Sequence, residues 1–381
     1  MDNLHSVFVE VDAIIARGDP ESALSILENV HHKFPQNEVV RIKIANLLAF
    51  LGKWEEAEAV LTKMLKEGCE GVWLYISLFD VFVHIGKIKQ AATLLEPHAE
   101  RFGNFWPFRE RLSRARAYFL INKRGAPDRG CSVIRNSFLV IGSSHINAIR
   151  GASKYAEQEH LRNSYTFKSI IDFKNDSKII DPVDGGFDDY QLNENMKKWL
   201  YENRSFDKIF LSISGSDYLS FCISAPNPSY DIIIPGREDL PRINGARVVP
   251  YEEMKARLKR HIRHVVLGIK AIRAEVSAPI IYLEPPPPIE DNQHLTQHAG
   301  WAERLLANSG PSSPIVRYKL WLLHSEIIKE ACESVGVVFL ELPSSVLNER
   351  GYLADSMLLN DVMHANLLFG AEILMQMDSF A

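Results

Sequence analysis

Apolar residues change their spacing along the chain at about residue 137. Beyond that point, short apolar runs of strand length alternate with segments in which apolar residues recur at the helical period. The expected strands are 138–141, 165–171, 208–213, 279–283 and 337–340, and the expected helices include 192–203, 254–272, 314–334 and one starting near 364. This alternation predicts an α/β fold with a parallel sheet of about five strands and helices on both faces.

Residues 1–125 follow another pattern, in which small and apolar positions recur every 34 residues. The recurring positions are Gly18, Gly52 and Gly86, then Ala23, Ala57 and Ala91, then Leu27, Leu61 and Leu95. A glycine lets the chain reverse, an alanine lets two helices approach closely, and a leucine fills the seam between them. The pattern therefore predicts an all-α solenoid of stacked helix pairs.

This segment resembles tetratricopeptide repeats, about three of them, with 105–120 as a closing helix. The resemblance implies a concave surface that binds a peptide or another protein. The alternative is that the helices only brace the second domain or a homodimer. Residues 126–136 lose the periodicity and gain Gly, Pro and charge, so the predicted domains are 1–125 and 137–381, joined by a linker.

Composition and charge narrow the class of protein. A chain of 381 residues can hold two or three domains, and its formal charge of −5 without a basic stripe argues against nucleic-acid binding. It has no basic leader and no run of eighteen apolar residues, so no membrane span is expected. The cysteines lack C-x-x-C spacing, which predicts reduced thiols in a cytoplasmic protein, without a disulfide framework or zinc site.

A hydroxyl pair follows the first predicted strand. The apolar run stops at Gly142, passes through Ser143 and Ser144, and enters a helical pattern. A serine at the first turn of a helix lies near unpaired amides that can stabilise an anionic intermediate. Taken alone, G-S-S-H is more often a helix cap than a nucleophile.

A second group lies more than two hundred residues downstream. Asp361 stands three residues before His364, at the start of the last predicted helix. An aspartate that accepts from one imidazole nitrogen leaves the other nitrogen free to take a serine proton. Taken alone, D-x-x-H is more often a capping carboxylate with a surface histidine. His294 and His298 have the spacing of one helix face, but their proline-flanked loop argues against zinc.

Together, these motifs resemble those of the SGNH or GDSL hydrolase superfamily over roughly residues 137–380. The first block, usually G-D-S-x, is matched at 142–145 and implies that Ser144 is the nucleophile. The last block, D-x-x-H followed by asparagine and glycine, is matched by Asp361, His364, Asn366 and Gly370. The proline-rich turn at 284–288 is also similar to that of family members.

The chain departs from the family in the blocks that form the oxyanion hole. Ser143 stands where aspartate is usual. In the third block, commonly G-x-N-D, the chain has Ser214-Gly215-Ser216-Asp217, so Ser216 replaces the asparagine that donates to the oxyanion. Loss of one such donor typically costs about 10²–10³ in rate. The glycine of the second block is Gly185 or Gly186, and the remaining donor is the backbone amide of Ser144.

The resemblance implies a serine esterase or acyltransferase that acts on a carboxylic ester, such as an O-acetylated carbohydrate or another small acyl ester. It requires neither a metal nor an organic cofactor. Residues 219–250, rich in Pro, Gly and Asn, are expected to form a lid or rim over the site. The alternative is a catalytically weakened hydrolase fold that serves as a ligand-binding or scaffold protein, which Ser216 favours.

Overall fold

The computed structural model of the protein describes residues 2–123, 136–156, 161–170, 179–182 and 190–380. The chain divides into two compact units, Met1–Phe119 and Leu120–Ala381. The predicted linker at 126–136 falls almost wholly outside the described residues, so its limits stay a prediction.

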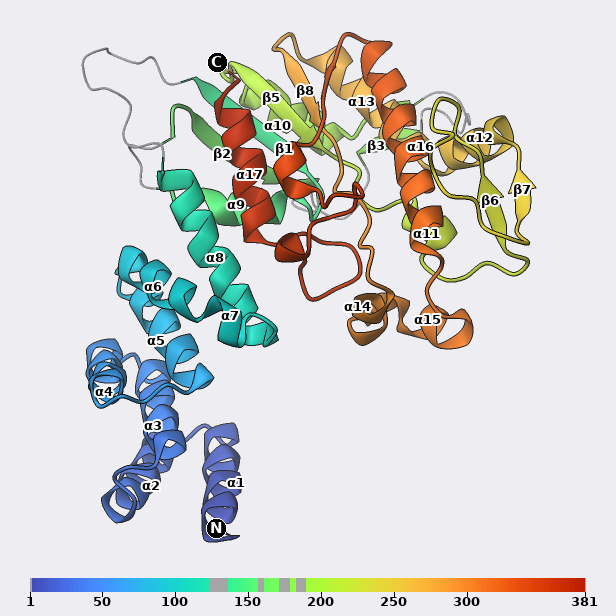
Figure 1. The fold of residues 1–381 in the computed structure, drawn as a ribbon. Helices are drawn as coiled ribbons and strands as arrows, with labels where there is room; N and C mark the ends of the chain where they lie inside the picture. The colour runs from blue at the N-terminus through green and yellow to red at the C-terminus, as the bar shows by residue number, and fades with distance from the viewer. Residues whose placement is uncertain (1, 124–135, 157–160, 171–178, 183–189, 381) are drawn as a thin grey trace. The chain divides into compact units, whose positions relative to one another are not determined.

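The first unit is helical, as expected (Figure 1). Its helices are α1 (Asp2–Ala16), α2 (Pro20–Lys33), α3 (Glu38–Phe50), α4 (Trp54–Lys66), α5 (Val72–His84), α6 (Ile88–Leu95), η1 (Glu96–His98), α7 (Ala99–Phe102) and α8, which begins at Trp106 and ends at Asn122. Asn37 caps α3 by accepting from the N–H of Val40, and Asp19 caps α2 in the same way from Ser22. From α1 to α6, each helix packs against the next one in sequence, as in helical repeats.

The 34-residue period matches structurally equivalent positions. Gly18, Gly52 and Gly86 have φ angles of +85°, +78° and +78°, a left-handed conformation that glycine adopts without strain. The alanines and leucines of the period are buried at 0–1% exposure: Ala23, Ala57, Ala91, Leu27, Leu61 and Leu95. The glycines therefore stand at turns and the alanines and leucines are buried, as the pattern predicted.

The second unit is built on a five-stranded parallel sheet, also as predicted. The strands are β1 (Ser137–Gly142), β2 (Ser164–Ser169), β5 (Lys208–Ser212), β8 (Ile280–Leu283) and β9 (Val338–Leu340), in the order β2-β1-β5-β8-β9. Residues 138–141 of β1 are fully buried, as suits a parallel strand covered on both faces. The order reverses between β1 and β5, so the switch point of the sheet lies there.

Helices and two small sheets surround these strands (Figure 1). The helices are α9 (Ile146–Ser153), α10 (Glu194–Glu202), α11 (Leu219–Cys222), α12 (Tyr251–His261), α13 (Arg263–Glu275), α14 (Asn292–Gln297), η3 (Gly300–Ala302), α15 (Glu303–Ser309), α16 (Pro314–Glu333), η4 (Ser344–Val346), η5 (Asp355–Met357) and α17 (Leu367–Asp378). β3 (Ile180–Pro182) pairs with β4 (Tyr190–Leu192), and β6 (Tyr230–Ile232) with β7 (Arg247–Val249). α9 packs on α17, and α13 on α16.

Near the end of β1, two glycines lie so close to neighbouring segments that a side chain would not fit. A Cβ atom on Gly142 would overlap the Ile146 side chain and the carbonyl of Ser212, and one on Gly370 would overlap the backbone of Ala148. β1 therefore lies close to β5, and α17 lies directly against α9. Asn366 caps α17 by accepting from Leu368 and Phe369.

One expectation is wrong. The single helix predicted for 254–272 is two helices that meet at Ile262, and both pack against α16. Residues 230–249, part of the predicted lid, form a small lobe around β6 and β7. Asp231 of this lobe pairs with Lys319 of α16 at 2.7 Å, and both side chains are 2% exposed. The lobe is thus tied to α16, and its role as a lid or rim over the site stays a prediction.

None of the helices in the described ranges combines the length and the apolar character that crossing a bilayer requires. Cys69, Cys222 and Cys332 are free thiols. Burial raises the pKa of the Cys222 and Cys332 thiols to about 12, so both are protonated and inert at neutral pH.

Candidate active site

Ser144 lies just beyond the carboxyl end of β1, at the switch point of the sheet, where open α/β folds bind their ligands. The neighbouring Ser143 donates its N–H to the carbonyl of Ser212 at 3.0 Å, which fixes the turn to β5. α9 begins two residues after Ser144. The strand, turn and helix expected from the sequence therefore hold this hydroxyl at the carboxyl ends of the strands.

The predicted Ser144, His364 and Asp361 lie together in one hydrogen-bonded line. Ser144 Oγ is 2.7 Å from His364 Nε2, and His364 Nδ1 is 2.7 Å from Asp361 Oδ2. A carboxylate only accepts, so Nδ1 carries the proton and Nε2 accepts from the serine hydroxyl. In this tautomer the imidazole can act as a base toward Ser144.

Asp361 is held in its ionised form. Burial alone would raise the pKa of its carboxyl, but hydrogen bonds from the His364 ring and from two backbone N–H groups outweigh burial and lower the pKa to about 2. The backbone donors are Met363 and His364, both bonded to Oδ1, at 2.8 and 2.7 Å. The His364 and Asp361 side chains are 26% and 31% exposed, so the line is open to solvent.

A histidine that sequence reasoning noted only as an improbable zinc ligand supports this loop. His294, on α14, has its Nε2 atom 3.0 Å from the carbonyl of Leu359 and 3.1 Å from that of Asp361. Carbonyls accept, so Nε2 donates to both. Within the described residues, no group of three His, Cys, Asp or Glu side chains is arranged to hold a metal ion.

The third sequence block forms the turn after β5. Ser216 Oγ donates to Met363 Sδ at 3.2 Å, so this residue lies beside the segment that carries His364. Asp217 does not point the same way: its Oδ2 atom accepts from Ser214 Oγ at 2.5 Å. Gly185 and Gly186, the predicted second-block glycines, lie outside the described residues.

A second group of serine, histidine and aspartate lies behind this turn, and sequence reasoning missed it. Ser214 Oγ is 2.9 Å from His324 Nε2 of α16. Because the hydroxyl gives its one proton to Asp217, it accepts from His324. Ser214 is 1% exposed and His324 is fully buried. Burial lowers the pKa of His324 to about 4 despite the nearby Asp217, so its ring is neutral at pH 7.

His145 fills the space between the two groups. It directly follows Ser144, its ring centre lies 5.0 Å from that of His364, and a Cβ atom on Gly215 would overlap it. Burial, followed by the charge of His364, lowers the pKa of His145 to about 3. The glycine of the third block is thus required by the side chain that follows the nucleophile.

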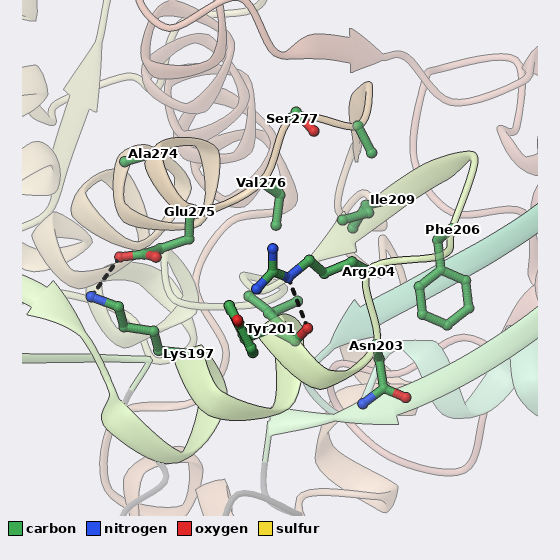
Figure 2. Close-up of a pocket in the computed structure, with 12 residues that line it drawn as sticks. Lys197, Tyr201, Asn203, Arg204, Phe206, Ile209, Ala274, Glu275, Val276 and Ser277 are labelled. Carbon is green, nitrogen blue, oxygen red and sulfur yellow. Dashed lines mark hydrogen bonds and ion pairs between the residues drawn. The ribbon is translucent and has the colours of Figure 1, made fainter.

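A pocket of about 420 Å³ lies at the opposite, amino-terminal edge of the sheet. Figure 2 shows its wall, where the Arg204 guanidinium lies 3.3 Å from the Tyr201 ring centre and Lys197 pairs with Glu275 at 3.0 Å. Its floor includes Leu200 and Ile209. Because β5 begins there, the pocket is separated from Ser144 by the length of the strand.

Comparison with known proteins identifies a repeat family in the first unit. Residues 15–68 match the family model described as tetratricopeptide repeat. YrrB, a tetratricopeptide repeat protein with an unusual peptide-binding site, is similar at 20% identity over 28% of this chain and 55% of its own, with a TM-score of 0.25. This chain therefore spans about half the length of that protein. No curated protein matches the chain.

Solved structures of acyl-ester hydrolases are also similar to this chain. A protein from Bacteroides fragilis that carries an acylhydrolase assignment is 12% identical over 68% of this chain and 92% of its own, with a TM-score of 0.32. Phospholipase A1 from Streptomyces albidoflavus is 11% identical over 65% of this chain and the whole of its own, with a TM-score of 0.30. Within this chain, residues 15–68 match tetratricopeptide repeats, and the second unit contains the five-stranded parallel sheet.

Proposed function

We propose that the second unit is a serine esterase or acyltransferase that acts on a carboxylic ester. The observation that carries this proposal is the line from Ser144 Oγ through His364 to Asp361, with 2.7 Å at each step. The ionised Asp361 fixes the tautomer, and the open position beyond β1 leaves room for a substrate. Both conditions are needed for nucleophilic catalysis by a hydroxyl.

In the proposed reaction, Ser144 Oγ attacks the ester carbonyl carbon as its proton passes to His364 Nε2. The tetrahedral intermediate carries its negative charge on the former carbonyl oxygen, near the Ser144 N–H and Ser216. The bond to the alcohol then breaks, and His364 returns the proton to the leaving oxygen. His364 next takes a proton from water or from an acceptor alcohol as that oxygen attacks the acyl carbon. It returns this proton to Ser144 Oγ as the bond between the serine and the acyl group breaks. These steps need no cofactor.

The alcohol that accepts the acyl group decides between an esterase and an acyltransferase. The His364 and Asp361 side chains are 26% and 31% exposed, which suits a small polar ester such as an O-acetylated carbohydrate. The runner-up function is a weakened hydrolase fold that binds a ligand or partner, and it is favoured by the absence of the usual asparagine at Ser216.

Turnover of p-nitrophenyl acetate by the full chain tests the proposal. Ser144→Ala should lower kcat at least about 10³-fold, because the nucleophile is lost. Ser143→Ala is the matched control, since that hydroxyl lies 3.5 Å from the Ser212 carbonyl and outside the line. A fluorophosphonate probe should label wild type and Ser143→Ala on Ser144. Equal turnover by wild type and Ser144→Ala, with no label, would favour the weakened-hydrolase function.

We also propose that the repeats bind a protein or peptide that brings the substrate. A groove of about 260 Å³ between α1, α2 and α3 supports this, with Phe50 at its edge and 69% exposed. Peptides selected from a displayed library on the full chain should lose binding to Phe50→Ser but not to Tyr201→Ser, an exposed ring in the second unit. Equal binding to both variants, or a stable homodimer without any peptide ligand, would favour the bracing role instead.

A further inference from the structure

Ser216 occupies the position at which the family resemblance predicts asparagine. Its hydroxyl is hydrogen-bonded to a sulfur atom. Ser216 Oγ donates to Met363 Sδ at 3.2 Å, across 147 residues of sequence. A thioether is a weak acceptor. We propose that Met363 is a positioning residue. Before the reaction, its sulfur accepts the hydrogen bond from the Ser216 hydroxyl beside His364. When the oxyanion forms, the hydroxyl donates to the oxyanion instead. This proposal rests on the proposed function of Ser144.

The backbone on the Ser216 side is fixed by its neighbours. The N–H of Ser214 donates to Tyr282 Oη at 3.0 Å, and the Ser214 hydroxyl is bonded to both Asp217 and His324. Gly215 lies against the His145 ring, with no room for a side chain. The turn is therefore held from β8, from α16 and from the nucleophile side, and it carries Ser216 without freedom to shift.

The backbone on the Met363 side is fixed as well. The N–H of Met363 donates to Asp361 Oδ1 at 2.8 Å, and the next N–H, that of His364, donates to the same oxygen. Ser216 and Met363 are both partly exposed, so a substrate can reach them. In the proposed transfer of the hydrogen bond from sulfur to an oxyanion, the hydroxyl and the thioether rotate while the backbone stays in place.

The choice of acceptor makes this transfer favourable. A hydrogen bond to an oxyanion is charge-assisted and is roughly twice as strong as one between neutral groups. A hydroxyl that already donates to a carboxylate would gain nothing, and Ser214 is such a hydroxyl, since it donates to Asp217. Ser216 gives up only a bond to sulfur. The substitution of asparagine by serine is therefore compensated by a resting partner that competes weakly.

The test compares wild type, Ser216→Ala and Met363→Leu with p-nitrophenyl acetate. Ser216→Ala should lower kcat about 10- to 100-fold with KM changed less than about twofold, because the donor acts mainly in the transition state. Met363→Leu should lower kcat about threefold, since the hydroxyl loses its resting orientation. Both variants should keep the far-ultraviolet circular dichroism of the wild type.

Hydrogen peroxide provides a second, reversible change. It transfers one oxygen atom to the Met363 sulfur and is itself reduced to water, and the sulfoxide oxygen is a strong acceptor. Wild-type kcat should fall about tenfold and return after methionine sulfoxide reductase, with oxidation of Met363 followed by peptide mass spectrometry. Met363→Leu, which lacks the sulfur, and Ser216→Ala, which lacks the hydroxyl, should not respond.

The outcomes separate this proposal from the function on which it rests. If Ser144→Ala abolishes turnover while Ser216→Ala turns over like the wild type, the role of the Ser216–Met363 pair is wrong and the esterase proposal stands. A peroxide response in Met363→Leu equal to that of wild type also overturns the role of Met363. If Ser144→Ala turns over like the wild type, both proposals fail together.

Discussion

The second unit contains two groups made of the same three residue types, arranged in different orders. In one, His364 lies between Asp361 and Ser144, and in the other Ser214 lies between His324 and Asp217. The hydrogen-bond lengths are similar, between 2.5 and 2.9 Å, but the second serine is 1% exposed.

The order within each group decides what its hydroxyl can do. Ser144 can give its proton to a histidine whose other nitrogen is held by a carboxylate. Ser214 gives its proton to a carboxylate directly, and it accepts from a neutral imidazole, so no imidazole is placed to take its proton. We therefore expect the first group to govern rate and the second to govern stability. The predictions below test that division, from the largest expected effect to the smallest.

Replacement of each aspartate by asparagine should give the largest difference in kcat between the two groups. Asp361→Asn should lower kcat about 10⁴-fold, because the amide no longer fixes the tautomer in which Nε2 accepts the serine proton. Asp217→Asn keeps an oxygen that accepts from Ser214 and should lower kcat less than about fivefold. Steady-state kinetics at pH 7 measures both. A larger rate loss for Asp217→Asn would place that carboxylate in the chemistry.

Removal of each serine hydroxyl in turn should affect stability in the opposite order to rate, with the larger loss of stability in the second group. Ser214→Ala leaves the His324 N–H and the Asp217 oxygen without their partner, which should lower the free energy of unfolding by about 1–3 kcal/mol. Ser144→Ala, at a half-exposed site, should change it by less than about 0.5 kcal/mol. Urea unfolding followed by circular dichroism gives both values. Comparable losses in the two variants would contradict the division.

As the pH is lowered, protonation of the buried histidines should reduce the free energy of unfolding before protonation of Asp361 does. The folded-state pKa values of His324 and His145 lie at about 4 and 3, below the ordinary 6.5, so the unfolded chain binds more protons between pH 6.5 and 4. Stability should therefore fall with decreasing pH, by up to about 1.4 kcal/mol per pH unit for each histidine. Asp361, with a pKa of about 2, loses its contribution only below about pH 4.

Urea unfolding at pH 7, 6 and 5 measures this dependence, with His324→Gln as the matched variant because its amide nitrogen can replace Nε2 as the donor. The slope against pH should be smaller in the variant than in the wild type. An equal slope would mean that His324 does not titrate with unfolding.

The parts of the site that could be predicted from the sequence depend on local spacing. Ser144 follows a strand and precedes a helix, and Asp361 lies three residues before His364, so each motif is short. The packing of α9 on α17 then brings the two motifs together. The 34-residue period was similarly readable, because each repeat packs mainly against its neighbour. Such features need no knowledge of distant contacts.

The missed features arise from contacts between distant segments. His324 lies among apolar residues of α16, where a histidine has the pattern of an ordinary core residue, and its partner Ser214 is 110 residues away. Met363 has no signal of its own beside D-x-x-H. The division at Ile262 falls where the chain has neither proline nor glycine. The His145 of G-S-S-H was visible, but only its packing on Gly215 gives it a role.

The buried pair between Asp231 and Lys319 sets a constraint on the order in which the chain is assembled. Their 88-residue separation means that a ribosome adding about 5–20 residues per second completes Lys319 about 4 to 18 seconds after Asp231. Until then the Asp231 carboxylate of the lobe around β6 and β7 has no partner, and the lobe cannot dock against α16. During that interval the nascent lobe should be open to proteases and chaperones, even though the repeats have already emerged.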